Sequence, residues 1–124
     1  MPDKKHLREP LSLPVYENSS EIEVFQNQVL RPVLKLQNEI YVMLFKDYAL
    51  RKTSGFTALS TEKKISFIDQ SMQKDNALRN LFIGMTIGML VPEEMKMYLS
   101  DAKAYNKRIM AMLSERIKSQ VELI

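Results

Sequence analysis

Apolar side chains recur every three or four positions from residue 22 onward, which is the spacing of an amphipathic α-helix. The first series consists of Ile22, Phe25, Val29, Val33, Leu36, Ile40 and Met43. Ser20 precedes it, with Glu23 three positions later, as in a capping box. The pattern predicts one long helix that opens at Ser20 and closes in the segment RKTSGFTALS. It is expected to be kinked at Pro32, because proline removes a backbone N–H and its ring clashes with the preceding turn.

Three further helices are predicted from the same periodicity. Residues 61–74 carry apolar side chains on one side and follow a capping residue, Ser60. A third helix is expected over residues 76–90, with Asp75 as its capping residue. A long fourth one is expected over residues 92–123, where a proline is well placed in the first turn. We therefore expect an all-α fold, a small four-helix bundle that forms one domain over residues 20–124.

The third predicted helix is the most apolar part of the chain. A helix over residues 81–91 rises only about 16 Å, whereas a bilayer core is about 30 Å thick, so no membrane span is expected. One side of this helix forms a smooth packing strip of Ala77, Leu81, Gly84 and Gly88. Each glycine costs about 1 kcal/mol relative to alanine inside a helix. We therefore expect the third helix and residues 36–50 at the centre of the domain, with the strip packed closely against residues 36–50 or, in the alternative, against a second copy.

Residues 1–19 are predicted to form an extended N-terminal arm. Three prolines prevent a regular helix there. The arm also lacks the continuous apolar core of a secretory signal, so a cytoplasmic protein is expected. Two interpretations of the arm stay open. It is either a solvated tail, or a strap whose apolar side chains lie against the bundle, namely Leu11, Leu13 and Val15.

Composition narrows the chemistry that the chain can carry. It has no cysteine and a single histidine, His6. Disulfides and cysteine-based metal sites are therefore excluded, and a serine–histidine–aspartate arrangement would depend on that one residue. The chain has no glycine-rich phosphate loop and no paired Glu-x-x-His motif. We expect a protein that is not an enzyme and that uses no metal or cofactor.

Two groups of polar residues are candidates for binding. The first, near one side of the proline-containing helix, consists of Gln28, Arg31, Lys35 and Asn38. It is either a solvated face or a polar groove, since carbonyls freed at a proline kink need partners. The second group, at the polar start of the third helix, consists of Asp75, Arg79 and Asn80. It is either an ion pair that closes the bundle or an anion contact beside a helix N-terminus.

The charge of the chain is weakly positive and thinly spread. There are 18 Lys and Arg against 15 Asp and Glu, which gives +3. The second half of the last predicted helix is basic, with Lys103, Lys107, Arg108, Arg116 and Lys118. Nucleic-acid binding by this face is an alternative, although no aromatic residues interleave with the basic ones and no recognition-helix turn is evident.

Four segments together resemble a known group of proteins. They are FQNQVLRPVLKLQNE, EKKISFIDQSMQKDNALRN, the helix with Gly84 and Gly88, and YNKRIMAMLSERIKSQ. The chain is similar, over residues 20–124, to a group of short, uncharacterised, all-helical bacterial proteins, some of which carry the name glyoxalase. Glyoxalase I enzymes resemble paired βαβββ modules with His and Glu metal ligands, and this chain has a single histidine and no predicted strand. The resemblance implies a bacterial, helical protein and assigns no role to any residue.

These observations lead to a functional expectation. Two helices that are apolar on nearly all sides, and a long striped helix, carry more apolar surface than a bundle of this size is expected to bury. We therefore expect a non-enzymatic helical interaction module, a homo-oligomer and most simply a homodimer, that presents the polar groove or the basic end of its last helix to a protein partner. The alternatives are a nucleic-acid-associated regulator and a small-anion-binding protein that uses Arg31, Lys35 or Arg79.

Overall fold

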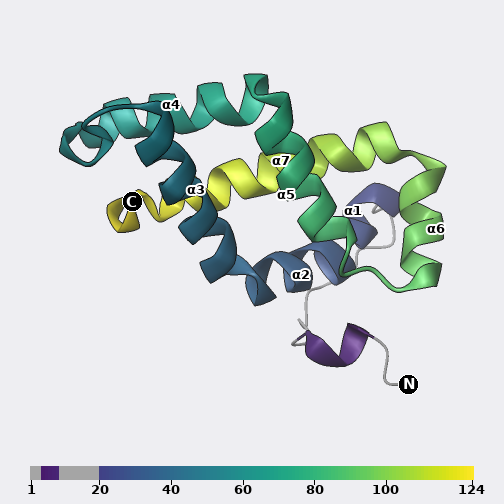
Figure 1. The fold of residues 1–124 in the computed structure, drawn as a ribbon. Coiled ribbons are helices and arrows are strands. Elements are labelled where there is room, and N and C mark those ends of the chain that lie inside the picture. Colours follow the sequence, from purple (N-terminus) through teal and green to yellow (C-terminus); the bar gives the residue numbers. More distant parts are fainter. Residues whose placement is uncertain (1–3, 9–19) are drawn as a thin grey trace.

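The computed structural model describes residues 4–8 and 20–124, and every regular element in these ranges is helical (Figure 1). The α-helices are α1 (Glu21–Phe25), α2 (Arg31–Leu36), α3 (Asn38–Lys52), α4 (Thr61–Lys74), α5 (Asn76–Ile87), α6 (Pro92–Ser100) and α7 (Ala102–Ser119). A π-helical turn, η2 (Gln26–Leu30), joins α1 to α2. Short 3-10 turns form η1 (Lys4–Leu7), η3 (Phe56–Ala58) and η4 (Val121–Leu123). The all-α prediction is confirmed for these residues.

Helix starts predicted from the sequence are confirmed at three capping residues. Ser20, Ser60 and Asp75 each precede an α-helix. The side-chain oxygen of each accepts the backbone N–H three positions ahead, at 3.1–3.2 Å. Such a bond satisfies a donor that the first helical turn leaves unpaired, and it contributes about 1 kcal/mol. These boundaries are local, which is why sequence alone locates them.

The first predicted helix is divided, although not by a simple kink at Pro32. The helical backbone continues through Pro32 because a π turn precedes it, in which the Arg31 N–H donates to the carbonyl of Gln26. The widened turn accommodates a proline that has no N–H for the regular ladder. The interruption comes afterwards, at Gln37, where φ is −98° and ψ is 9°. The single long helix expected from Ser20 onward is therefore replaced by α1, η2 and α2, followed by α3.

The expectation of one long helix over residues 92–123 is wrong. The chain changes direction at Asp101, with φ −157° and ψ 63°, between α6 and α7 (Figure 1). The Asp101 carboxylate accepts the N–H of Ala104 and so begins α7 as a capping residue. Across the corner, the rings of Tyr98 and Tyr105 lie 6.3 Å apart, and both side chains are buried. Positions seven apart in a straight helix are separated by about 10.5 Å along its axis, and the corner at Asp101 lets the two rings pack more closely than that.

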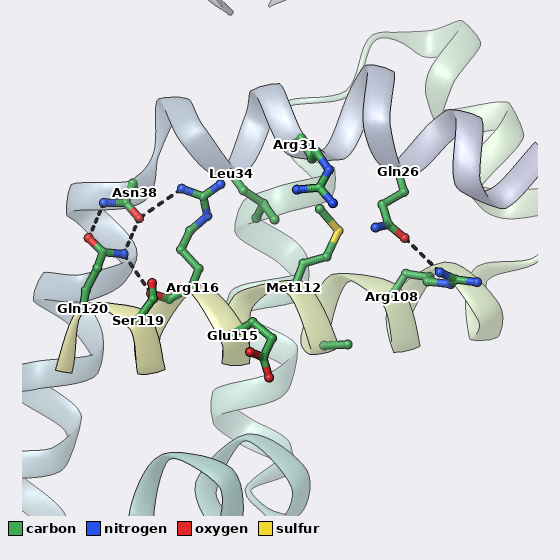
Figure 2. A pocket seen from close by; sticks show the side chains of 11 residues that line it. Gln26, Arg31, Leu34, Asn38, Arg108, Met112, Glu115, Arg116, Ser119 and Gln120 are labelled. Carbon is green, nitrogen blue, oxygen red and sulfur yellow. Dashed lines mark hydrogen bonds between the residues drawn. The ribbon is translucent and has the colours of Figure 1, made fainter. Parts of the chain in front are cut away.

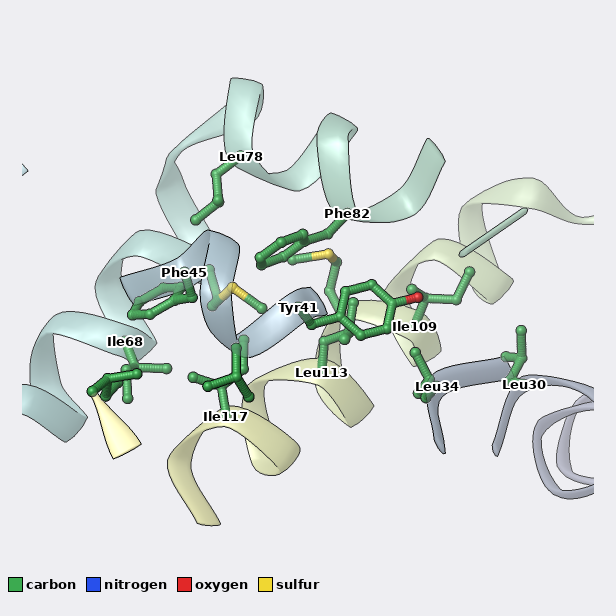
Figure 3. Close-up of a cluster of buried hydrophobic side chains, with 14 of the residues drawn as sticks. Leu30, Leu34, Tyr41, Phe45, Ile68, Leu78, Phe82, Ile109, Leu113 and Ile117 are labelled. Atoms are coloured by element: carbon green, nitrogen blue, oxygen red, sulfur yellow. The ribbon is translucent and has the colours of Figure 1, made fainter. Parts of the chain in front are cut away.

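The hydrophobic core lies where α3 meets α4, α5 and α7 (Figure 3). Its fully buried side chains include Tyr41, Phe45, Ile68, Phe82, Ile109 and Leu113. The rings of Tyr41 and Phe82 meet edge to face with their centroids 5.7 Å apart. The Tyr41 hydroxyl and the Thr86 hydroxyl share a hydrogen bond of 2.8 Å, which satisfies both polar groups inside the core. The inner side of α3 is therefore central, as expected for residues 36–50.

The packing strip of α5 lies on the surface, so its predicted position in the core is wrong. Ala77, Gly84 and Gly88 are exposed, and Leu81 is 48% exposed. A Cβ atom on Gly84 would meet nothing within 4 Å, and one on Gly88 would approach only the backbone of its own helix. On its other side the helix buries Leu78, Phe82 and Thr86 instead.

No helix in the described ranges combines the length and the apolar character that a membrane crossing requires.

Exposed apolar side chains adjoin this strip. Leu36, Ile40, Met43 and Leu50 of the α2–α3 stretch are 45–64% exposed. Leu44 of α3 and Leu81 of α5 line one cavity of about 410 Å³, so these two helices border the same cavity. The homodimer expected from the sequence stays a prediction, and these side chains are the apolar surface that motivates it.

The described part of the N-terminal arm, residues 4–8, packs against the junction of α5 and α6. The Arg8 guanidinium donates to both carboxylate oxygens of Glu94, at 2.5 and 3.0 Å, and to the carbonyl of Met89 at 3.2 Å. Both side chains of this ion pair are at least nine-tenths buried. The arm contacts predicted from the sequence involve residues outside the described ranges, namely Leu11, Leu13 and Val15.

Candidate functional site

A groove of about 720 Å³ runs between the first helical stretch and α7 (Figure 2). One wall comes from η2, α2 and the start of α3, and the other wall from α7. At one end Arg108 bonds to Gln26, and at the other end Gln120 bonds to Asn38, so the two walls run in the same direction. The apolar part of the lining consists of Leu34, Ala111 and Met112. We call this site the arginine groove, after the guanidinium groups of Arg31, Arg108 and Arg116.

The π turn places two polar side chains in the groove. Gln26 and Arg31 are five residues apart, and in a regular α-helix they would point about 140° away from each other. In a π turn, five residues make about one full turn, so both side chains reach the same groove. The local cause is Pro32, which follows directly. A feature that looks like a helix defect in the sequence therefore shapes one wall of the site.

Two of the three arginines are exposed and bond to uncharged side-chain amides. The Nε of Arg31 donates to Oδ1 of Asn27 at 2.8 Å. One terminal nitrogen of Arg108 donates to Oε1 of Gln26 at 3.0 Å. A guanidinium carries five N–H donors, so each of these groups is oriented by one bond and keeps further donors directed at the groove or solvent. Neutral partners orient the two charges without neutralising them.

The third arginine, Arg116, is half-buried and bonds to Oδ1 of Asn38 at 3.4 Å. Burial lowers the pKa of Arg116, and the positive charge of Arg31 lowers this pKa further. Tyr41 acts in the opposite direction and raises the pKa. The two guanidinium charges of Arg31 and Arg116 therefore repel each other across the groove. An anion bound between them would relieve this repulsion.

The acidic residue of the lining, Glu115, is turned toward a different partner. Its side chain is 78% exposed, and it forms an ion pair of 3.1 Å with Lys118. Lys118 also pairs with Asp69 of α4 at 2.9 Å, and the hydrogen bond to Asp69 is the main reason why the pKa of Lys118 is raised. The carboxylate of Glu115 is therefore engaged at the rim, and the interior of the groove is dominated by positive charge.

One end of the groove is held by a matched pair of amides. Nδ2 of Asn38 donates to Oε1 of Gln120 at 2.7 Å, and Nε2 of Gln120 donates back to Oδ1 of Asn38 at 2.8 Å (Figure 2). Nε2 of Gln120 also donates to the backbone carbonyl of Arg116 at 2.9 Å. These bonds, with the one from the Arg116 guanidinium to Asn38, hold the Asn38 side chain against the C-terminal end of α7.

The groove carries the chemistry of binding. The hydroxyl of Ser119 donates to the carbonyl of Arg116 at 2.7 Å, and no histidine or cysteine lines the groove beside it. Over the described ranges, no three His, Cys, Asp or Glu side chains gather as metal ligands. What the lining offers is guanidinium and amide donors next to an apolar patch. Guanidinium groups suit carboxylate and phosphate oxygens, which they can bind through two parallel hydrogen bonds.

The structure separates the first group of predicted site residues. Arg31 and Asn38 line the arginine groove, whereas Gln28 and Lys35 do not. Both of the latter are exposed and lie on other sides of the same helical stretch. The π turn changes the angular relation between residues before and after it, so a wheel drawn for one regular helix misplaces Gln28. Two of the four residues of this group therefore line a groove, and the other two lie outside it.

The second group, Asp75, Arg79 and Asn80, lies at the α4–α5 corner and contributes nothing to the arginine groove. Asp75 caps α5 and accepts the Tyr48 hydroxyl at 2.7 Å, which is the main reason why the pKa of Asp75 is lowered. Arg79 donates to the carbonyl of Met72 at 2.7 Å and so satisfies the last turn of α4. Asn80 is exposed. These side chains have structural partners, which account for their positions.

Sequence reasoning noted Arg108 and Arg116 as basic but did not join them to the polar groove. A signal was available, because Arg108, Met112, Arg116 and Gln120 recur at intervals of four. Residues four apart share one helix face, so these side chains form a continuous wall. What no local signal shows is that this wall faces Arg31 across the molecule.

Comparisons with protein-family models, with curated proteins and with solved structures found no match. What the arginine groove can bind therefore follows from its own geometry and charge. Its walls are helical and bridged at both ends, its lining is positive with an apolar middle, and its interactions are noncovalent.

Proposed function

We propose that this protein is a non-enzymatic binding module that holds an acidic segment of a protein partner in the arginine groove. The supporting observation is that three guanidinium groups line one groove and bond there to uncharged amides. A carboxylate can form two parallel hydrogen bonds with a guanidinium, and such charge-assisted bonds are about twice as strong as neutral ones. An acidic ligand therefore gains more from this lining than a neutral ligand of the same size.

The partial burial of the groove strengthens this preference. Two unit charges 4 Å apart interact by about 1 kcal/mol in bulk water but by about 4 kcal/mol at the effective dielectric constant near a protein surface. Arg116 is half-buried, and its charge is disfavoured by Arg31. Binding of a carboxylate between these residues would offset both the burial and the repulsion.

The length of the groove favours a chain segment over a single small ion. Gln26 and Asn38 at the two ends of this wall are twelve positions apart, which corresponds to about 18 Å along a helix. Its middle is apolar, with Leu34 on one wall and Met112 on the other. A lone inorganic anion would leave this apolar stretch uncovered, whereas a peptide would bury it and meet arginines on either side.

Fluorescence polarisation with a labelled decapeptide of alternating glutamate and alanine tests the proposal. Binding is expected at low salt and should weaken as salt is added, because salt screens partly exposed charge pairs. Arg116→Gln and Arg108→Gln should each weaken binding about tenfold, the effect of losing one charge-assisted hydrogen bond. Arg51→Gln is the matched control, since Arg51 is exposed and pairs with Asp47 outside the groove. Equal losses of affinity in all three variants would mean that the peptide binds through the net charge of the protein alone.

A further inference from the structure

We infer that the arginine groove selects one pattern of acidic peptide, an extended segment with the order acidic, any, apolar, any, acidic. This inference rests on the proposed function and adds to it the spacing and conformation of the occupant. It follows from three properties of the groove, namely the distance between its outer arginines, the apolar residues between them, and the bonds that join its walls (Figure 2).

The spacing comes from α7. Arg108 and Arg116 are eight residues apart on this helix, which corresponds to about 12 Å along its axis. In an extended peptide, alternate side chains point to the same side and each residue advances the chain by about 3.3 Å. Side chains at positions i and i+4 therefore face the same wall about 13 Å apart. Two carboxylates at these positions match the two arginines.

The middle position is apolar for the same reason. Met112 lies halfway between Arg108 and Arg116 in sequence, and Leu34 lines the opposite wall. Residue i+2 of the extended peptide points to the same side as i and i+4, and it falls over this apolar pair. An aliphatic side chain there removes the apolar surface of Leu34 and Met112 from water, which an acidic side chain at this position would not do.

The bonds between the walls favour an extended chain over a helix. Arg108 bonds to Gln26 at 3.0 Å, and Gln120 bonds to Asn38 at 2.7 Å, so side chains from the two walls touch at both ends of the groove. A helical ligand with its side chains is about 10–12 Å across. An extended strand needs only about 5 Å beside its neighbour. An extended peptide, being narrower than a helix, can therefore place its side chains between the two walls.

The lining also favours a peptide over a nucleic acid. Single-stranded nucleic acids are held largely by aromatic side chains on which the bases stack. None of the residues that line the arginine groove is aromatic. Carboxylates on a peptide can be matched to the arginines with an aliphatic side chain between them, which a sugar–phosphate backbone does not offer.

Two labelled peptides of the same composition test the pattern. The patterned peptide is Gly-Ser-Glu-Ala-Leu-Ala-Glu-Ser-Gly, and the permuted peptide is Gly-Ser-Glu-Glu-Ala-Leu-Ala-Ser-Gly. We expect the patterned peptide to bind at least about tenfold more tightly, because only it can engage Arg108 and Arg116 together. A single-stranded oligonucleotide of equal net charge is measured in parallel. Thermal unfolding of each variant, followed by circular dichroism, shows whether it is folded.

Double-mutant cycles then assign the contacts. Each glutamate of the patterned peptide is changed to glutamine in turn and measured against Arg108→Gln and Arg116→Gln. The inference requires Arg108 to couple to one glutamate and Arg116 to the other. Arg108 is exposed, so its variant gives a reading even if the half-buried Arg116 proves necessary for folding. Coupling of both arginines to the same glutamate overturns the assigned spacing.

The outcomes separate this inference from the proposed function. If both peptides bind equally and both lose affinity in the arginine variants, the groove binds acidic segments but without the pattern, and only the inference fails. If neither peptide binds at low salt, the proposed function fails as well. Tighter binding of the oligonucleotide than of the patterned peptide would also overturn the inference, because it would identify a phosphate backbone as the better ligand.

Discussion

Replacing Arg8 by methionine should destabilise the protein by about 3 kcal/mol, because it removes one partner of a buried ion pair with Glu94. Arg8 is far from α6 in sequence, yet its guanidinium bonds to both oxygens of this carboxylate. Methionine keeps most of the apolar stem of arginine and removes the charge. The variant therefore tests the ion pair with little change in packing volume.

The magnitude follows from the burial of the pair. The side chains of Arg8 and Glu94 are 5% and 9% exposed. Removing one partner of a buried ion pair costs about 3–5 kcal/mol. Glu94 also accepts the backbone N–H of Val91 at 3.0 Å, which would still stabilise its charge, so the lower end of that range applies. For a domain of this size the loss corresponds to a midpoint about 10 °C lower.

Urea unfolding followed by circular dichroism measures this loss. Arg8→Met with Glu94→Gln should lose less stability than the sum of the two single changes, because both remove the same ion pair. Arg51→Met is the control, since Arg51 and Asp47 form an ion pair of 3.0 Å that is 74% and 63% exposed. Its loss should stay below about 1 kcal/mol. A loss for Arg8→Met no larger than this would refute the docking of residues 4–8 on the bundle.

Two smaller predictions concern α5. Gly84→Ala should raise the free energy of unfolding by up to about 1 kcal/mol, since a Cβ there meets nothing within 4 Å; a lower thermal midpoint would contradict the surface position of the packing strip. Tyr48→Phe should raise the pKa of Asp75, which the Tyr48 hydrogen bond lowers. Because the pKa of Asp75 is lower in the folded protein, its carboxylate stabilises the fold above the unfolded-state pKa, and this stabilisation is lost as the pH falls through the folded-state pKa. Tyr48→Phe should therefore lose less stability on acidification than the unchanged protein. NMR titration of Asp75 measures this pKa.

Much of the local structure could be predicted because its causes lie within a few residues. The capping bonds of Ser20, Ser60 and Asp75 each join residues three positions apart. The break at Asp101 was not predicted, because nothing in the periodicity of residues 92–123 indicates an end. Asp101 caps α7 where the chain turns, beside the buried rings of Tyr98 and Tyr105.

The candidate site was predicted in part. Arg31 and Asn38 belonged to a group interpreted as either a solvated face or a polar groove, and the basic half of the last helix was considered as a binding face. That these are two walls of one groove could not be inferred, because the bonds between them join residues about eighty positions apart. The role of Glu94 could not be predicted either. Its position in the first turn of a helix suggests only a favourable interaction with the helix dipole, whereas in the structure it forms a buried ion pair with Arg8.

The sequence by itself determined the helical class and most helix starts, since periodicity and capping act over one or two turns. It did not determine which side of an apolar helix faces inward. Both α3 and α5 carry apolar residues on more sides than the core can cover, and packing around Tyr41 and Phe82 left the strip with Gly84 exposed. The arginine groove was likewise decided by the tertiary structure, because Arg31 and the two arginines of α7 act on the same space only when packing brings their helices together.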